Sequence, residues 1–367
     1  MQCKAAVVRG PGDDFIVETV DIAEPRMDEV LVRIAGVGLC HSDLHMRDRA
    51  PPPSFPWILG HEGAGTVEAV GEAVTDLVVG DKVVISFNSC GTCAGCRTDH
   101  PAYCSDFMLL NGSGRRRDGS PAIRSLDGAP IGSHFFGQSS FAELSLAHRR
   151  NVVKVPADAP LEILGPLGCG LQTGAGAAMR ELACAPGSSI LILGAGTVGM
   201  ACIMGAAIQG CTTIIVSEPF ANRREMALEL GATHVIDPAA QDLVAAVAAI
   251  APDGVNYAFD TTGNPQVIHG GILSLGIKGT IALAGIEADP LAHVPVTGDE
   301  LRRRGISIRG GSEGDSDIAS FIPQLLGLWR EGRFPIEKLV SRYPLSDINR
   351  AVSDQLAGKC LKPVLIP

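Results

Sequence analysis

Residues 188–284 alternate short apolar segments with longer helical ones, and this repeat constrains the fold more than any other feature of the sequence. Strands are predicted at 188–193, 212–217, 234–237, 255–260 and 280–284, and helices at 197–209, 222–230, 243–250 and 265–275. Gly231 follows the second helix, at a position where a helix end favours glycine. Repeated strand–helix–strand units predict a doubly wound parallel sheet of the α/β class.

The segment 194–199 reads GAGTVG and joins the first predicted strand to its helix, so it matches the pattern G-x-G-x-x-G in the required context. Gly194 permits the tight turn, and Gly196 lets a pyrophosphate approach the backbone. Gly199 lets the helix pack closely on the strand. Thr197 and Val198 open the helix, whose unpaired N–H groups face the phosphates. We therefore predict a dinucleotide-binding Rossmann sheet.

Glu218 ends the second predicted strand, 19 residues beyond Gly199. A carboxylate here accepts hydrogen bonds from ribose hydroxyls and repels a 2′-phosphate, which favours NAD over NADP. Arg223 and Arg224 follow closely, and an arginine at this point can pair with a 2′-phosphate. The prediction is NAD, with Arg223 among the cofactor-binding residues.

Charge and composition exclude several classes of function. Lys and Arg number 30 against 40 Asp and Glu, a net charge of −10, and aromatic residues make up only 4%. A nucleic-acid binder needs a basic face, so no nucleic-acid partner is expected. Residues 190–208 carry no charge and approach the length of a membrane span. The glycines of the dinucleotide loop explain this stretch better than a membrane span does. No membrane association is therefore expected.

Four of the 11 cysteines fall within 15 residues. They are Cys90, Cys93, Cys96 and Cys104. Four thiolates suit a closed, tetrahedral, structural zinc site. An iron–sulfur cluster is the rival, although the ferredoxin spacing places the fourth cysteine three residues on, before a proline. No secretory leader is recognised at the start of the sequence, so a cytoplasmic location is expected, where clustered cysteines indicate a metal.

A second set of metal-binding residue types is dispersed. Cys40, His61 with its neighbour Glu62, and Cys169 are far apart in the sequence. Spacing does not join them, since a lone buried cysteine is usually a small apolar residue. Their local settings, 60–63 (GHEG) and 168–170 (GCG), suit tight turns that present a ligand. Residues alone leave both interpretations open, a joint metal site or separate core positions.

Several motifs occur in a fixed order along essentially the whole chain. They are 40–45 (CHSDLH), 60–67 (GHEGAGTV), the four clustered cysteines, 168–170 and 194–199. Together they resemble the zinc-containing alcohol dehydrogenases of the medium-chain dehydrogenase/reductase family. The segments 260–265 (DTTGNP), 313–316 (EGDS) and 332–335 (GRFP) resemble the aryl-alcohol, or benzyl alcohol, dehydrogenase branch.

The resemblance implies a division of the chain into domains. Residues 1–170 are expected to form a mainly β, GroES-like catalytic domain with the zinc lobe at about 88–135. Strands predicted at 4–8, 30–34, 65–70 and 82–86 agree with this. Residues 171–309 would form the NAD-binding domain, and 310–367 would return to the catalytic domain. The tail is predicted to hold helices at 318–331 and 346–357 and a strand at 362–366.

The resemblance also assigns catalytic roles. Cys40, His61 and Cys169 would hold a catalytic zinc with one position left for substrate oxygen, so each chain would carry two zinc ions. Ser42 would take the alcohol proton and pass it through the nicotinamide ribose to His45. Asp43 would fix the His61 ring, as carboxylate partners of ligating histidines do. Glu62 matches an acidic residue that coordinates the metal transiently.

Cofactor and substrate contacts follow from the same resemblance. His41 and Lys362 would face the pyrophosphate, and Ile286 would line the nicotinamide. Ser42 is small and leaves room near the zinc, while Trp57 and Phe87 are candidates for the pocket wall or for the core.

The expected activity is reversible oxidation of a primary, aromatic or bulky apolar alcohol to its aldehyde, by hydride transfer from a zinc-bound alkoxide to NAD. A glutathione-dependent formaldehyde dehydrogenase is one alternative, and Arg115–Arg117 offer cations for its substrate, although these arginines also suit a solvated face. A non-catalytic NAD- and zinc-binding protein is the other alternative. A homodimer or homotetramer joined through the cofactor domains is expected.

Overall fold

The computed structural model describes residues 1–51, 54–286 and 293–367, which divide into two compact units. The first unit contains Met1–Cys169, Asp317–Arg330 and Pro335–Pro367, and the second contains Gly170–Ser316 and Glu331–Phe334. The second unit extends past the predicted boundary at 309. β16 (Ser307–Gly310) pairs in parallel with β15 (Leu275–Leu283) and carries the sheet to residue 310. Residues 311–316 also belong to this unit, because Gln172 donates to Oε2 of Glu313 at 3.2 Å and accepts from Oγ of Ser316 at 2.8 Å.

The second unit is built on a six-stranded sheet in the order β13-β12-β11-β14-β15-β16. Its remaining strands are β11 (Ser189–Leu193), β12 (Thr213–Ser217), β13 (His234–Ile236) and β14 (Val255–Asp260). Each neighbouring pair is parallel. The order reverses beside β11, which is the arrangement of a doubly wound α/β sheet. The predicted fold class is confirmed.

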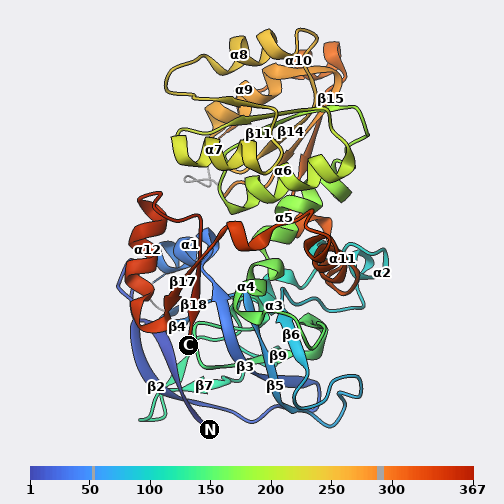
Figure 1. The fold of residues 1–367 in the computed structure, drawn as a ribbon. Coiled ribbons are helices and arrows are strands. Elements are labelled where there is room, and N and C mark those ends of the chain that lie inside the picture. The colour runs from blue at the N-terminus through green and yellow to red at the C-terminus, as the bar shows by residue number, and fades with distance from the viewer. Residues whose placement is uncertain (52–53, 287–292) are drawn as a thin grey trace. The chain divides into compact units, whose positions relative to one another are not determined.

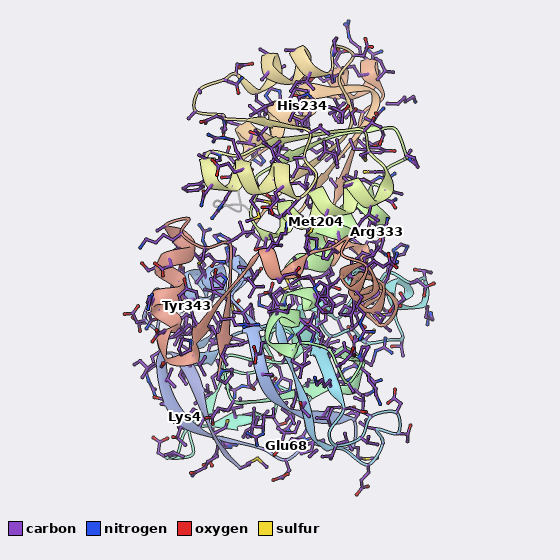
Figure 2. The ribbon with its side chains drawn as sticks, viewed as in Figure 1. Lys4, Glu68, Met204, His234, Arg333 and Tyr343 are labelled. Carbon is purple, nitrogen blue, oxygen red and sulfur yellow. The ribbon has the colours of Figure 1, made fainter. Side chains whose placement is uncertain are left out.

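Helices cover both faces of this sheet, with α6 and α7 on one face and α8, α9 and α10 on the other (Figure 1). Their bounds are α6 (Thr197–Gln209), α7 (Ala221–Glu229), α8 (Leu243–Ile250), α9 (Pro265–Ser274) and α10 (Gly298–Arg304). The unit begins with α5 (Gly170–Gly176). Leu191, Ile215 and Ile281 of the strands are fully buried. Met204 on α6 is 2% exposed (Figure 2).

The uncharged stretch 190–208 is divided between β11 and α6. Within the described residues, no helix combines the length and the apolar character that crossing a bilayer requires. The stretch is therefore apolar because β11 lies inside the sheet and α6 packs against it.

The first unit contains two sheets, of five and seven strands. The smaller has the order β4-β1-β2-β7-β8, formed by β1 (Gln2–Val8), β2 (Ile16–Ile22), β4 (Trp57–Ile58), β7 (Ile123–Arg124) and β8 (Pro130–Ile131). The larger has the order β10-β6-β5-β3-β18-β17, with β9 paired to β3. Its strands are β3 (Glu29–Gly38), β5 (Gly63–Val70), β6 (Lys82–Ile85), β9 (Leu144–His148), β10 (Val152–Lys154), β17 (Val340–Pro344) and β18 (Lys362–Ile366).

Short helices connect these strands (Figure 1). They are α1 (His41–Arg49), α2 (Ala94–Arg97), α3 (Phe107–Gly112), α4 (Leu161–Leu164), α11 (Ile318–Arg330) and α12 (Ile348–Leu356). The core contains fully buried residues from both sheets, among them Leu31 and Ile58, and the loop residue Phe141. β18 pairs with β3, so the end of the chain lies beside the strand that leads into α1.

Candidate functional site

The turn into α1 is organised by the buried carboxylate of Asp43. Its Oδ2 accepts a hydrogen bond of 2.9 Å from the backbone N–H of Cys40. Its Oδ1 accepts one of 2.9 Å from the N–H of Gly60 and lies 2.9 Å from Nδ1 of His61. The two oxygens of one carboxylate thus hold the segments that carry Cys40 and His61. Oδ1 also orients the imidazole ring.

The other ring nitrogen of His61, Nε2, is buried and has no hydrogen-bond partner in the described part of the chain. Burial disfavours a charged ring, but the Asp43 carboxylate and the Cys40 sulfur raise the pKa of His61 well above its ordinary value. The pKa of the Cys40 thiol is lowered, first by a hydrogen bond from Cys169 and also by Lys362 and His61. The electrostatic field at Nε2 therefore stabilises a cation there.

Four possible ligand atoms lie within 4.8 Å of one another, and they belong to Cys40, His61, Glu62 and Cys169. All four side chains are buried. The backbone of Gly165 lies directly against that of Glu62, since a Cβ at Gly165 would lie 2.1 Å from the carbonyl oxygen of Glu62. Two thiols and an imidazole with a free nitrogen fit a catalytic zinc of the Cys₂His type. The structure thus joins the dispersed set into one site.

Glu62 forms a buried ion pair with Lys362, whose Nζ lies 3.0 Å and 2.9 Å from the two carboxylate oxygens. Nζ also donates to the carbonyl oxygen of Leu39 at 3.1 Å. Burial opposes the charge of Glu62 and raises its pKa, while Lys362 lowers it. Lys362 is only 2% exposed and is engaged by the metal cluster. Its role against a pyrophosphate stays a prediction.

Three polar residues of α1 lie next to this cluster in the sequence. Ser42 is half-buried, and its Oγ lies 3.8 Å from Sγ of Cys40. His45 follows one helical turn later and is also half-buried, and burial, aided by Arg49 and His41, lowers its pKa. His41 is exposed at the helix start. The proton path and the pyrophosphate contact of His41 stay predictions.

Two aromatic rings contact the imidazole of His61, and neither was predicted from the sequence. The ring of Phe136 stacks on the imidazole at 4.4 Å, and the ring of Phe135 meets it edge-on at 5.3 Å. Gln138 was also missed, although its Nε2 donates to the carbonyl oxygen of His61 at 2.8 Å. Two adjacent phenylalanines in a chain with few aromatics were the available signal. Gln138 gave no signal.

The four clustered cysteines form the second metal site, here called the cysteine lobe (Cys90, Cys93, Cys96 and Cys104), with ligand atoms within 4.8 Å of one another. Backbone N–H groups point at the sulfurs, at 3.2 Å from Cys90 to Cys104 and at 3.3 Å from Cys93 to Cys90. Such bonds from Cys96 and Ser105 lower the pKa of Cys93 to about 5. The lobe matches a structural zinc site.

In the second unit, the glycine loop has the geometry that its motif requires. Gly194 has a φ of +92°, which favours glycine. A Cβ on Gly199 would lie 2.0 Å from the carbonyl oxygen of Gly194, so the helix start packs tightly on the loop. A Cβ on Gly196 would meet nothing within 4 Å, so that side of the loop is open. Thr197 and Val198 form the first turn of α6.

Glu218 follows β12 and is 3% exposed. Its carboxylate accepts hydrogen bonds from the backbone N–H of Ala195 at 2.7 Å and of Phe220 at 3.0 Å. Arg223 lies over the ring of Phe220, with its guanidinium carbon 4.8 Å from the centroid. Arg224 forms an ion pair of 3.0 Å with Asp237. Glu218 thus lies directly against the glycine loop, as its predicted role requires.

Ile286 is 41% exposed and lies after β15. Its predicted contact with the nicotinamide stays a prediction.

Comparison with known families agrees with this geometry. Residues 26–157 match the family described as alcohol dehydrogenase GroES-like domain, and residues 197–327 match the zinc-binding dehydrogenase family. The chain is 48% identical over 370 residues to a geraniol dehydrogenase of Castellaniella defragrans, which covers 100% of this chain and 98% of that protein.

Two solved structures are similar over the whole chain. An alcohol dehydrogenase zinc-binding domain protein from Burkholderia ambifaria has a TM-score of 0.97 and 48% identity, covering 100% of this chain and 99% of that one. Benzyl alcohol dehydrogenase from Acinetobacter calcoaceticus has a TM-score of 0.96 and 42% identity, with the same coverage. The chain belongs to the zinc-dependent alcohol dehydrogenases of the medium-chain dehydrogenase/reductase family.

Proposed function

We propose that this alcohol dehydrogenase oxidises primary alcohols with an aromatic or bulky apolar group to aldehydes, with NAD as the hydride acceptor. The ring of Phe136 carries the proposal, because it is partly exposed while it stacks on the metal-ligand candidate His61. A planar or unsaturated substrate group gains a stacking partner there that a short alkyl group cannot use.

Further rings extend the apolar surface beside His61. Phe107 lies 6.0 Å from Phe136, and Phe87 lies 5.9 Å from Phe107, measured between ring centroids. Trp57 and Phe87 are each 2% exposed, so they support the wall from behind. Phe136 has a φ of 49°, an unfavourable value for a bulky side chain, and such strain is typical of functional sites.

Cys40, His61 and Cys169 would hold the zinc ion, which would supply polarisation of a hydroxyl group and a lower pKa for it. Asp43 keeps His61 in the tautomer that presents Nε2. Ser42 accepts the substrate proton near Cys40, and His45 receives it at the end of the path. Because its pKa is lowered, His45 is neutral near pH 7 and can act as a base.

NAD is favoured over NADP by the position of Glu218 against the glycine loop. A 2′-phosphate would meet its carboxylate, and Arg224 is engaged by Asp237. Replacing Glu218 with Ala is expected to weaken NAD binding about tenfold and to reduce the preference over NADP. An unchanged ratio of kcat/KM for the two cofactors would contradict this role.

The edge strand β16 is exposed along all four of its residues, Ser307–Gly310. Pairing with the same edge of a second copy would continue the sheet, which supports a homodimer or a homotetramer. Light scattering of the protein at micromolar concentration, with a monomer as the contradicting result, tests this association. A cytoplasmic location is part of the proposal, because clustered cysteines in a reducing compartment bind metal in place of forming disulfides.

The decisive experiment measures NADH formation from NAD with benzyl alcohol beside ethanol at matched concentrations. A kcat/KM at least tenfold higher for benzyl alcohol is expected, with geraniol as a non-aromatic, unsaturated comparison. Replacing Phe136 with Leu should reduce that preference while zinc content stays constant. Equal rates with both alcohols would contradict the aromatic preference, and the absence of turnover would contradict the activity.

A parallel reaction with formaldehyde and glutathione tests the glutathione-dependent alternative. Arg116 of the arginine triplet is bound to Glu29 by two hydrogen bonds, at 2.7 Å and 2.8 Å. That contact removes one of the cations which the alternative requires. Turnover that depends on glutathione would favour the alternative over our proposal.

A further inference from the structure

A cavity of about 230 Å³ in the first unit is lined by an unusual number of cations. Five arginines border it, and we call it the arginine pocket: Arg26, Arg115, Arg116, Arg117 and Arg150. Three carboxylates, those of Asp28, Glu29 and Asp118, also border it, so the arginines exceed them by two. Of the metal-ligand candidates, only Cys90 is among its lining residues.

Two of the three carboxylates of the arginine pocket are engaged by its arginines, and the third contacts a histidine. Glu29 holds Arg116 at 2.7 Å, and both side chains are 7% exposed. Asp118 holds Nη1 of Arg26 at 2.7 Å. Asp28 lies 3.1 Å from Nε2 of His148. Of these pairs only Glu29–Arg116 is buried, and its two charges need each other because removal from water is costly for each of them.

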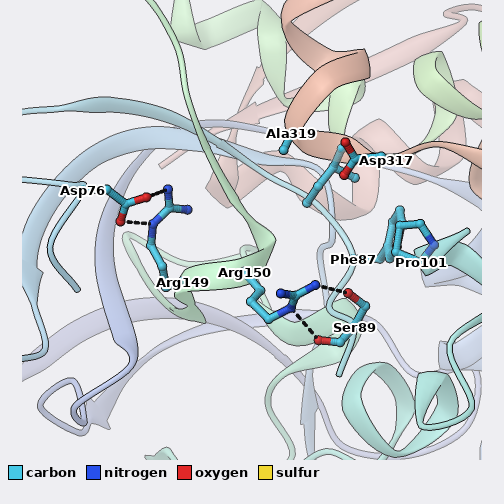
Figure 3. Close-up of a pocket in the computed structure, with 9 residues that line it drawn as sticks. Asp76, Phe87, Ser89, Pro101, Arg149, Arg150, Asp317 and Ala319 are labelled. Atoms are coloured by element: carbon cyan, nitrogen blue, oxygen red, sulfur yellow. Dashed lines mark hydrogen bonds and ion pairs between the residues drawn. The ribbon is translucent and has the colours of Figure 1, made fainter. Parts of the chain in front are cut away.

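Two arginines lack an acidic partner in the described part of the chain. Nη1 of Arg115 is buried and has no hydrogen-bond acceptor there. Arg150 donates only to neutral oxygens of Ser89, the carbonyl at 3.1 Å and Oγ at 3.3 Å. Figure 3 shows this contact from a second pocket, of about 360 Å³, that shares Ser89 and Arg150. Arg117 differs, since its Nη2 pairs with Asp106 at 3.0 Å.

The histidines of the arginine pocket add no positive charge at neutral pH. Burial lowers the pKa of His134 to about 4 and also lowers the pKa of His148. The excess positive charge therefore comes from guanidinium groups, which stay protonated at all physiological pH values.

We propose that the arginine pocket binds a phosphate dianion, either the free ion or the phosphate group of a small phosphomonoester. Arg115 and Arg150 have no acidic partner among the described residues and can both donate to one anion, while the remaining carboxylate, Asp28, is exposed to solvent. Their N–H groups form the planar arrangement that pairs with phosphate oxygens, and a charge-assisted bond would satisfy Nη1 of Arg115. This site is independent of the proposed alcohol oxidation.

Isothermal titration calorimetry of the zinc-loaded protein with inorganic phosphate, at constant ionic strength, tests the proposal. Saturating NAD keeps phosphate away from the glycine loop of the second unit. Replacing Arg115 with Gln should weaken phosphate binding at least about tenfold. The matched control Arg117→Gln removes an exposed arginine from the same triplet and should change affinity less than about threefold. Glycerol phosphate in a second titration distinguishes a phosphomonoester from the free ion as the preferred ligand.

A chemical footprint covers the case in which Arg115→Gln does not fold. Phenylglyoxal modification of the wild-type protein, read by mass spectrometry, should slow at Arg115 and Arg150 when phosphate is added and continue at Arg117. The absence of binding heat in the wild-type protein would overturn the proposal. Equal affinity of a folded Arg115→Gln variant, or equal modification with and without phosphate, would overturn it as well.

Discussion

The cysteine lobe and the Cys40–His61–Glu62–Cys169 cluster are both four-residue metal sites of the first unit, but they are assembled differently. The lobe lies within residues 90–104, and three of its cysteines are only half-buried. The other cluster draws its ligands from three distant segments and is wholly buried.

Different groups stabilise the ligand side chains at the two sites. In the lobe, backbone N–H groups of nearby residues donate to sulfur, as Cys93 does to Cys90 at 3.3 Å. In the catalytic cluster, charged side chains act over long sequence separations, namely Asp43 on His61 and Lys362 on Glu62. A closed site made by its own loop suits a structural role, whereas a site held by charged neighbours can be tuned for chemistry.

The largest effect is expected from removal of one catalytic ligand. Replacing Cys169 with Ala should reduce kcat at least about a thousandfold, because zinc supplies several kcal/mol of stabilisation to the reacting oxygen. Zinc analysis should show one ion per chain in place of two, while NAD still binds. Cys3→Ala, which removes a buried thiol from the core, is the control and should retain both ions. Turnover near the wild-type rate would refute the catalytic assignment.

The corresponding change in the lobe should affect stability more than chemistry. Replacing Cys93 with Ala removes a thiol whose pKa is lowered to about 5 by N–H groups. We expect a loss of several kcal/mol of unfolding free energy and one zinc ion, with kcat of the folded protein within about threefold of wild type. Thermal unfolding and zinc content measure this. A thousandfold loss of kcat at an unchanged Tm would break the comparison.

A smaller effect is expected from Asp43, the carboxylate that orients a ligand of the catalytic site. Replacing Asp43 with Asn places an NH₂ group against one of the N–H donors of Cys40 and Gly60 and weakens the hold on His61. Zinc affinity at this site should fall about 10- to 100-fold, measured by competition with a chelator. Asp106→Asn neutralises a carboxylate beside the lobe and serves as the control. Equal losses in both variants would contradict a specific role for Asp43.

The same difference between local and distant contacts decides which elements of the fold could be predicted from the sequence. α6, α8 and β14 begin and end where their patterns predicted, since strand–helix repeats are encoded locally. β2 and β9 were not predicted, because their place depends on pairing with distant strands. The return to the first unit was placed at 310, whereas the second unit continues to Ser316, because Gln172 holds Glu313 and Ser316 across more than 140 residues.

The sites obey the same rule. The spacing of the four lobe cysteines was sufficient to predict a metal site, because one loop supplies every ligand. The spacing of Cys40, His61 and Cys169 was not, and only the resemblance to a family joined them. Phe136 and Gln138 were missed because their contacts with His61 cross 75 or more residues and leave no periodic signal.

The smallest effect should appear only in the pH dependence of the catalytic site. His45 accepts a proton only when neutral, and its lowered pKa extends the neutral form below the ordinary value of 6.5. Replacing His45 with Gln leaves solvent to take the proton, and hydroxide becomes scarcer as pH falls. Alcohol oxidation should therefore slow about tenfold near pH 6 and less than about twofold near pH 9. His234→Gln, an exposed change in the second unit, should leave the profile unchanged. Cys93→Ala should also leave the pH profile unchanged, since the lobe handles no proton. A pH profile altered by Cys93→Ala but not by His45→Gln would reverse the roles assigned to the two sites.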